Sequence, residues 1–288
     1  DFVFRAEWSS SVVLEMVTDS GYIALEHDWD PAPSYPWEDI DFLVDGVETD
    51  HRYVEKTSYR TVGFEIPEGK HHIQIWFPWN AKIRLEHVFV EDSAMVEQPA
   101  PKKHRILCFG DSITQGYIGH HPAFNYVGIL SRTLNAECLN QAIGGYWFQG
   151  ASLDGALADY HPDLITVAYG TNDYSLKNTF ADFSDGVTGF VTRLKEIFPH
   201  TPVLGIMPIY RNDDRFRPRR FLRSYTHEEA MEEIRRCYRR YPDITILEDT
   251  WCPHTADFFA PDKLHPNDLG FSVYGAAVVQ KAKEILSE

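Results

Sequence analysis

The stretch Ile106-Leu-Cys-Phe-Gly-Asp-Ser-Ile-Thr-Gln-Gly116 decides the fold of the larger part of the chain. Four apolar residues end at Phe109, and a glycine, an aspartate and a serine follow them. An apolar run bounded by turn-forming residues predicts a buried strand, and Gly110 permits a tight turn at its end. Aspartate and serine favour helix starts, so a helix is expected close to Ser112. The stretch therefore predicts a buried strand that leads directly into a helix.

Apolar runs alternate with amphipathic segments of helix length through the rest of the chain. The predicted strands are Ile106–Phe109, Ala136–Ala142, Leu164–Tyr169, Val203–Met207 and Ile244–Glu248. The last amphipathic segment is Asn267–Leu286. This alternation predicts a parallel sheet that is covered by helices on both faces, with reactive groups at the carboxyl ends of its strands.

The residues before this region follow a different pattern. From Phe2 to about Ala94, short alternating runs such as Tyr22–Glu26 and Arg60–Ile66 are separated by turn signals, without a convincing helical stretch. We predict an antiparallel β-sandwich or jelly roll over residues 1–97. Residues 98–104 contain two prolines and a polar end, which is typical of a linker, and residues 105–288 form the second domain.

The composition excludes several classes of protein. The chain has 288 residues, of which 43% are hydrophobic and 24% charged, as in globular proteins, and it contains no apolar run of membrane-spanning length. A formal charge of −16 disfavours a nucleic-acid partner. The four cysteines lack CxxC spacing, which argues against a zinc site and a dense disulfide framework. The opening residues lack a basic start followed by an apolar stretch, which favours a cytoplasmic location, with a secreted protein whose signal is already removed as the alternative.

Residues suited to nucleophilic catalysis follow the predicted strands. Ser112 lies at an expected helix start, where backbone N–H groups favour negative charge. Gly144 and Gly145 follow the second strand, and Asn172 follows the third. Each feature alone has a structural explanation as well: a helix cap for the serine, a turn for the glycines and an Asx turn for the asparagine.

A histidine and an aspartate precede the last amphipathic segment. His265 is a suitable general base because imidazole titrates near neutral pH, and Asp262 could hold its tautomer. Asp and His at this spacing also occur in solvated helix starts, and Asn267 and Asp268 are candidate helix caps.

The sequence motifs around Ser112, the two glycines, Asn172 and His265 form four blocks. In this order they resemble the SGNH (GDSL) hydrolase family over roughly residues 104–288. The resemblance implies a flavodoxin-like three-layer α/β/α sandwich, with residues 105–288 as the catalytic domain. It implies Ser112 as nucleophile, His265 as base and Asp262 as the acid that orients it. The implied oxyanion hole consists of the Ser112 N–H, Gly145 and Asn172, with Gly144 as the competing glycine.

The resemblance extends to two-domain carbohydrate acetylesterases with an N-terminal jelly roll, and it implies a serine esterase. The expected reaction is hydrolysis of small acyl esters, with acetyl preferred, of a carbohydrate or similar polyol. An acyltransferase that uses the same acyl-enzyme is the alternative. A catalytically inert glycan-binding protein is a remote alternative, because it would require one of the four catalytic motifs to lack its catalytic residue. No metal or organic cofactor and no membrane partner are expected, while a homo-oligomer is left open.

Several further residues are candidate substrate contacts. Asp111 adjoins the nucleophile, and Trp147 belongs to an aromatic run that forms either a wall of the site or core. Arg211 begins a segment with six arginines between positions 210 and 223, which predicts either a lid or clamp for an anionic or polyhydroxylated substrate or else a solvated face or subunit contact. Trp76 and Trp79 could stack on sugar rings, although burial in the sandwich core or packing between the domains is the competing interpretation.

Overall fold

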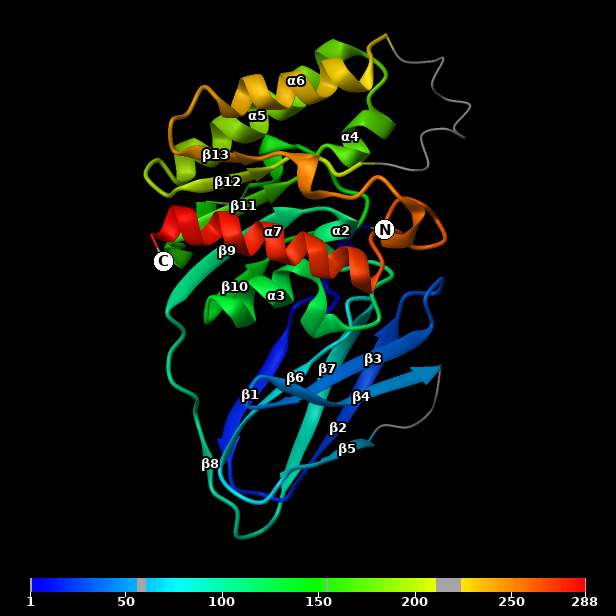
Figure 1. The fold of residues 1–288 in the computed structure, drawn as a ribbon, viewed down its shortest axis with the longest axis vertical. Helices are drawn as coiled ribbons and strands as arrows, with labels where there is room; N and C mark the ends of the chain where they lie inside the picture. Colours follow the sequence, from blue (N-terminus) through cyan, green and yellow to red (C-terminus); the bar gives the residue numbers. More distant parts are fainter. Residues whose placement is uncertain (1, 56–60, 154, 211–223, 288) are drawn as a thin grey trace.

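The computed structural model describes residues 2–55, 61–153, 155–210 and 224–287. Figure 1 shows two parts, an α/β part that contains the C-terminus and a β-sandwich whose strands lie between Val13 and Glu97. No helix within the described residues has the length and apolar character needed to cross a lipid bilayer.

The α/β part is built on a five-stranded parallel sheet. Its strands are β9 (His104–Gly110), β10 (Ala136–Asn140), β11 (Leu164–Ala168), β12 (Val203–Ile206) and β13 (Ile244–Leu247). Their order is β10-β9-β11-β12-β13, which is the flavodoxin-like order 2-1-3-4-5. The predicted parallel sheet is therefore confirmed. In this order the chain changes direction across the sheet between β9 and β11, and their carboxyl ends define the switch point where ligands bind in such folds.

Helices cover both faces of this sheet (Figure 1). The helices are α3 (Tyr126–Thr133) and α7 (Asp268–Leu286) on one face, and α5 (Phe180–Ile197) and α6 (His227–Tyr238) on the other. Because side chains alternate along a strand, Ile106 and Cys108 of β9 enter the first core while Leu107 and Phe109 enter the second. The three-layer arrangement is confirmed.

Short helical turns complete this part of the chain. They are α2 (Ser112–Gln115), α4 (Thr171–Leu176), η1 (Pro122–Phe124), η2 (Gly150–Ser152), η3 (Gly155–Tyr160), η6 (Asp249–Trp251) and η7 (Ala256–Phe258). Both α2 and α4 begin at carboxyl ends of parallel strands, directly after β9 and β11.

The sandwich consists of two antiparallel sheets. The first has the order β4 (Val47–Glu55), β3 (Trp37–Val44), β6 (His71–Trp76), β1 (Val13–Thr18) and β8 (Val96–Glu97). The second has the order β5 (Thr61–Glu65), β2 (Tyr22–Pro31) and β7 (Ala81–Val90). Apolar residues such as Ile23, Phe42 and Ile75 fill the space between the sheets. The prediction of an antiparallel sandwich is confirmed, and its boundaries at residues 97 and 104 remain a proposal.

The first described residues depart from the strand pattern. Helix α1 covers Phe2–Ala6, a short helix that the alternating pattern of this part did not predict. Five residues are too few to show a helical period, and the helix has no buried residue that would mark a face.

The two parts share an aromatic interface. Trp79 packs against Trp8, Tyr35 and Tyr117, and its indole N–H donates a 2.9 Å hydrogen bond to the Gly119 carbonyl. Trp76 packs in a second cluster with Leu43 and Ala123. Trp76 and Trp79 are each 1% exposed, so neither is available to stack on a sugar ring. The interpretation as interdomain packing is confirmed.

Candidate active site

Ser112 is the first residue of α2, directly beyond the carboxyl end of β9. Asp111 caps this helix, because its Oδ1 accepts a 3.0 Å hydrogen bond from the Ile113 N–H. The turn before it requires Gly110, since a Cβ there would lie 1.9 Å from Thr114 Oγ1. Ser112 remains 8% exposed. The strand-to-helix turn therefore leaves the hydroxyl at the sheet edge.

His265 reaches this hydroxyl from the other end of the chain. Its Nε2 lies 2.7 Å from Ser112 Oγ, and its Nδ1 lies 2.5 Å from Asp262 Oδ2. The loop is held by Asn267, which caps α7 by accepting a hydrogen bond from the Gly270 N–H. Tyr117 stacks on the imidazole, with ring centroids 5.3 Å apart. The serine, histidine and aspartate thus form one hydrogen-bonded chain.

Asp262 is held in its ionised form. Burial alone would raise the pKa of this carboxyl, but hydrogen bonds from the His265 side chain and from the Leu264 and His265 N–H groups outweigh burial and lower the pKa. A carboxylate on Nδ1 fixes the imidazole tautomer that leaves Nε2 free to accept a proton.

The loop after β10 brings two glycines to the same edge. The Gly144 N–H donates a 2.8 Å hydrogen bond to Gln115 Oε1, so this donor is already engaged. Gly145 adopts a left-handed φ of 82°, and its N–H has no hydrogen-bond partner among the described residues. Of the two glycines, Gly145 therefore offers the available donor.

Helix α1 supports this loop from the β-sandwich half. Arg5 Nη1 donates a 2.6 Å hydrogen bond to the Gly144 carbonyl, and the Arg5 carbonyl accepts one of 2.8 Å from Gln115 Nε2. Phe2 packs edge-on against Tyr146, with ring centroids 5.3 Å apart. The conformation of the glycine loop thus depends on residues about 140 positions earlier in the chain.

Asn172 follows β11 and lies on α4. Its Nδ2 donates to the Tyr146 carbonyl at 2.9 Å and more weakly to Asp111 Oδ2 at 3.3 Å. The longer contact is the one that a negatively charged oxygen could replace. The amide therefore faces the region between the nucleophile turn and the glycine loop.

Asp173, the next residue, joins two loops of the site. Its carboxylate accepts hydrogen bonds from the Phe148 N–H at 3.0 Å and from the Gly170 N–H at 3.1 Å. Burial raises the pKa of Asp173 to about 7, although these backbone hydrogen bonds oppose the shift. The buried carboxyl therefore connects the turn that precedes Asn172 to the loop that follows the two glycines.

The three residues predicted to contact substrate lie in different environments. Asp111 is 1% exposed, and its carboxylate binds the Ile113 N–H and Asn172, so burial makes it a support for the site and not the expected substrate contact. Trp147 is half-buried and stacks on Tyr146. Arg211 and the arginine-rich segment to residue 223 lie outside the described residues.

Three neighbours of the site were not predicted from the sequence. Gln115 and Tyr117 lie within five residues of Ser112, so their closeness to the nucleophile in the sequence could have identified them as neighbours of the site. Burial raises the pKa of Tyr117 to about 12, and the phenol therefore stays neutral beside His265. Arg5 carries no local signal because its role depends on how the two halves pack.

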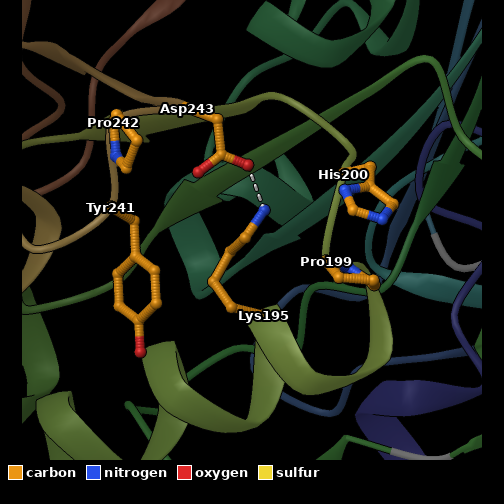
Figure 2. A pocket seen from close by; sticks show the side chains of 6 residues that line it. All are labelled: Lys195, Pro199, His200, Tyr241, Pro242 and Asp243. Atoms are coloured by element: carbon orange, nitrogen blue, oxygen red, sulfur yellow. Dashed lines mark hydrogen bonds and ion pairs between the residues drawn. The ribbon is translucent and has the colours of Figure 1, made fainter.

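A surface hollow elsewhere on the molecule is separate from this site. Figure 2 shows it, lined by Lys195 in the last turn of α5 and by residues of the loops that precede β12 and β13, at the amino ends of these strands. Lys195 forms an ion pair with Asp243 there and donates a 3.0 Å hydrogen bond to the Thr201 carbonyl. The catalytic candidates lie at the opposite, carboxyl edge of the sheet.

The sheet order and the Ser-His-Asp chain at its switch point define a hydrolase of the three-layer α/β/α class. The family model of the GDSL-like lipase/acylhydrolases matches residues 108–273, more than half of the chain. This protein belongs to that family, whose members are ester hydrolases. No curated protein matches the sequence significantly.

Solved structures share the arrangement of both parts. The salicylyl-acyltransferase SsfX3 from a tetracycline biosynthetic pathway has a TM-score of 0.82 and 22% identity, covering 98% of this chain and 85% of that one. A Bacteroides ovatus protein described as a GDSL-like lipase has a TM-score of 0.73 and 18% identity, covering 98% and 86%. A family two carbohydrate esterase from Clostridium thermocellum, in complex with cellohexaose, has a TM-score of 0.70 and 18% identity, covering 97% and 94%. These similarities show a shared two-part fold.

Proposed function

We propose that the protein hydrolyses small acyl esters, with acetyl preferred, of a carbohydrate or similar polyol through an acyl-enzyme on Ser112. The observation that carries this proposal is the 2.7 Å contact between Ser112 Oγ and His265 Nε2, with Asp262 on the far side of the imidazole. This geometry suits proton transfer from the hydroxyl as it attacks a carbonyl.

The first half of the reaction forms the acyl-enzyme. His265 Nε2 takes the Ser112 proton as Oγ bonds to the ester carbon, which gives a tetrahedral oxyanion. The C–O bond to the alcohol then breaks, and His265 returns the proton to the departing oxygen. In the second half, His265 deprotonates water, which attacks the acyl carbon, and Ser112 leaves with the proton.

The proposed oxyanion hole has three donors. The Ser112 N–H has no acceptor within α2 because it belongs to the first residue of the helix. The Gly145 N–H lacks a partner among the described residues, and the Asn172 amide can exchange its long contact with Asp111. Donors fixed in advance stabilise the developing charge without reorganisation.

The carbohydrate assignment is supported by the family and by the shared two-part fold, since a solved carbohydrate esterase covers nearly the whole chain. We expect the wild type to hydrolyse p-nitrophenyl acetate and acetylated xylan, with rates that fall as the acyl chain lengthens to octanoate. Turnover is measured from released p-nitrophenol and acetate, with Ser112→Ala as the blank. Rates equal to that blank on every short-chain ester would contradict the proposal.

An acyltransferase with the same acyl-enzyme is the second candidate. It is favoured by the similarity to a salicylyl-acyltransferase over 98% of this chain. The two functions differ in what attacks the acyl-enzyme, water or an alcohol. Chromatography of products formed with a polyol acceptor present separates them, because transfer yields a new ester while hydrolysis yields only free acid.

Asp262→Asn is expected to lower kcat for p-nitrophenyl acetate about 10²-fold, less than the about 10⁴-fold loss known for a fully buried triad aspartate. The reason for the smaller effect is that the Asp262 side chain is 36% exposed, so water can partly replace its carboxylate. Steady-state kinetics at neutral pH measures the change. Asp257→Asn, an exposed residue five positions earlier, serves as the matched control and should retain wild-type kcat.

A further inference from the structure

A cluster of carboxylates and imidazoles lies where the sandwich meets the loop that follows α2. Asp41 on β3 and His51 on β4 are directly opposite each other in the antiparallel register. Ile40, Phe42 and Val44 point into the sandwich core, so Asp41 on the alternate face points toward the α/β part. Its Oδ2 accepts a 2.7 Å hydrogen bond from the Ala123 N–H of that part. The cluster therefore spans both halves of the chain.

An irregularity in the sheet brings a second carboxylate to this face. The register of β3 and β4 shifts between Phe42 and Leu43, so that Leu43 pairs with Glu48. Because paired residues share a face, Glu48 lies on the same side as Asp41. His121 from the α2–η1 loop completes the group, with its Nδ1 3.3 Å from Glu48 Oε1.

The donor atoms are close enough together to share one ion. Asp41 Oδ1 lies 2.8 Å from His51 Nδ1 and 3.1 Å from His121 Nδ1. One donor atom from each of the four residues lies within 4.8 Å of all the others. Tetrahedral zinc with bonds of about 2.1 Å holds its ligands about 3.4 Å apart. The separations of 2.8, 3.1 and 3.3 Å would widen slightly on binding, and the remaining ones start at 4.8 Å or less.

A buried aspartate next to the cluster supports this assignment. Asp39 is fully buried, and its Oδ1 has no hydrogen-bond partner among the described residues. The nearest candidate is His51 Nε2, at 3.5 Å. If Nδ1 of this imidazole bound a metal, Nε2 would carry the proton and would donate it toward Asp39. Histidine ligands of metals usually have such a carboxylate behind them.

The charge of the group favours a divalent cation. Three carboxylates, those of Asp39, Asp41 and Glu48, lie in or beside the cluster, and the Arg132 guanidinium is a fixed cation that interacts with the last two. Two negative charges are left over when the imidazoles are neutral. Buried charges need such compensation. It comes either from two protons, because the carboxylates of Asp39 and Asp41 raise the pKa of His51 and of His121, or from one divalent ion bound to the neutral imidazoles.

We propose that Asp41, Glu48, His51 and His121 bind one divalent transition-metal ion of the zinc type, which cross-links the sandwich to the loop after the nucleophile helix. Two imidazole and two carboxylate ligands favour zinc over calcium or magnesium. Four protein ligands make a closed site with a structural role. The expectation of a metal-free protein rested on cysteine spacing and on the reaction, neither of which bears on ligands that come from two halves of the chain.

The test uses untagged protein that has been treated with EDTA and dialysed. Calorimetric titration with Zn²⁺ at neutral pH should show one ion bound per chain, and Co²⁺ should give the strong visible absorption of a tetrahedral site. Loss of a ligand should weaken binding at least about 10- to 100-fold in His51→Gln and in His121→Gln. His71→Gln is the matched control, because His71 also pairs with an aspartate of the sandwich, at 2.7 Å from Asp45, but lies outside the cluster.

A second readout guards against misfolded variants. The melting temperature of the wild type and of His71→Gln should rise with added Zn²⁺, while those of the two cluster variants should not. Hydrolysis of p-nitrophenyl acetate by each variant shows that it is folded. Wild-type protein that binds no Zn²⁺ or Co²⁺ stoichiometrically would overturn the proposal and leave a cluster neutralised by protons. Binding by the cluster variants equal to that of wild type would overturn it as well.

Discussion

Ser112→Ala is expected to lower kcat for p-nitrophenyl acetate by about 10⁶-fold, with little change in KM. The reason is that Ser112 Oγ is the atom proposed to form the covalent bond, so its removal leaves His265 without the hydroxyl that it activates. Initial rates at high enzyme concentration, followed over hours, measure so large a loss. Ser272→Ala replaces an exposed serine on α7 and should retain full activity.

The serine and histidine should also act as one unit. His265→Ala is expected to lose about as much activity as Ser112→Ala, and the double variant no more than either single one, because each removal disables the same step. Losses that multiply in the double variant would contradict a shared Ser-His mechanism. A fluorophosphonate probe should label the wild type and not Ser112→Ala, which tests the nucleophile independently of substrate.

Asn172→Ala is expected to lower kcat by about 10²- to 10³-fold, the usual cost of one oxyanion donor. The effect should fall on kcat and much less on KM, since the amide is proposed to bind the oxyanion and not the ground-state carbonyl. Kinetics on p-nitrophenyl acetate measure both constants. Asn178→Ala, which changes an exposed asparagine two residues beyond α4, is the control. Nearly full activity in Asn172→Ala would remove this residue from the oxyanion hole.

The parallel sheet was predictable because its strands are short, mostly apolar segments between turn signals, and five such segments in alternation with helices allow few arrangements. The approach of Ser112 to His265 followed from that sheet, because both residues stand at its carboxyl edge. The choice between Gly144 and Gly145 could not be predicted. It depends on which N–H the Gln115 side chain occupies, a detail of side-chain packing.

Polar contacts between the halves were the part that the sequence did not reveal. Asp41 and His121 are 80 positions apart and belong to different folding patterns, so no local spacing links them. Asp111 was expected to touch substrate because it adjoins the nucleophile, but its carboxylate is needed to cap α2 and contact Asn172. Local sequence identifies reactive residues well, whereas the residues that hold them are selected by tertiary packing.

Arg5 has a consequence for how such proteins can be recombined. It belongs to the sandwich half, yet its guanidinium and carbonyl hold the glycine loop and Gln115 of the other half. If the chain were cut within residues 98–104, the C-terminal fragment would keep every proposed catalytic side chain. It would lose the two hydrogen bonds that Arg5 makes with Gly144 and Gln115. We therefore expect that the sandwich cannot be exchanged for that of another enzyme without loss of these contacts. The two halves are expected to evolve together.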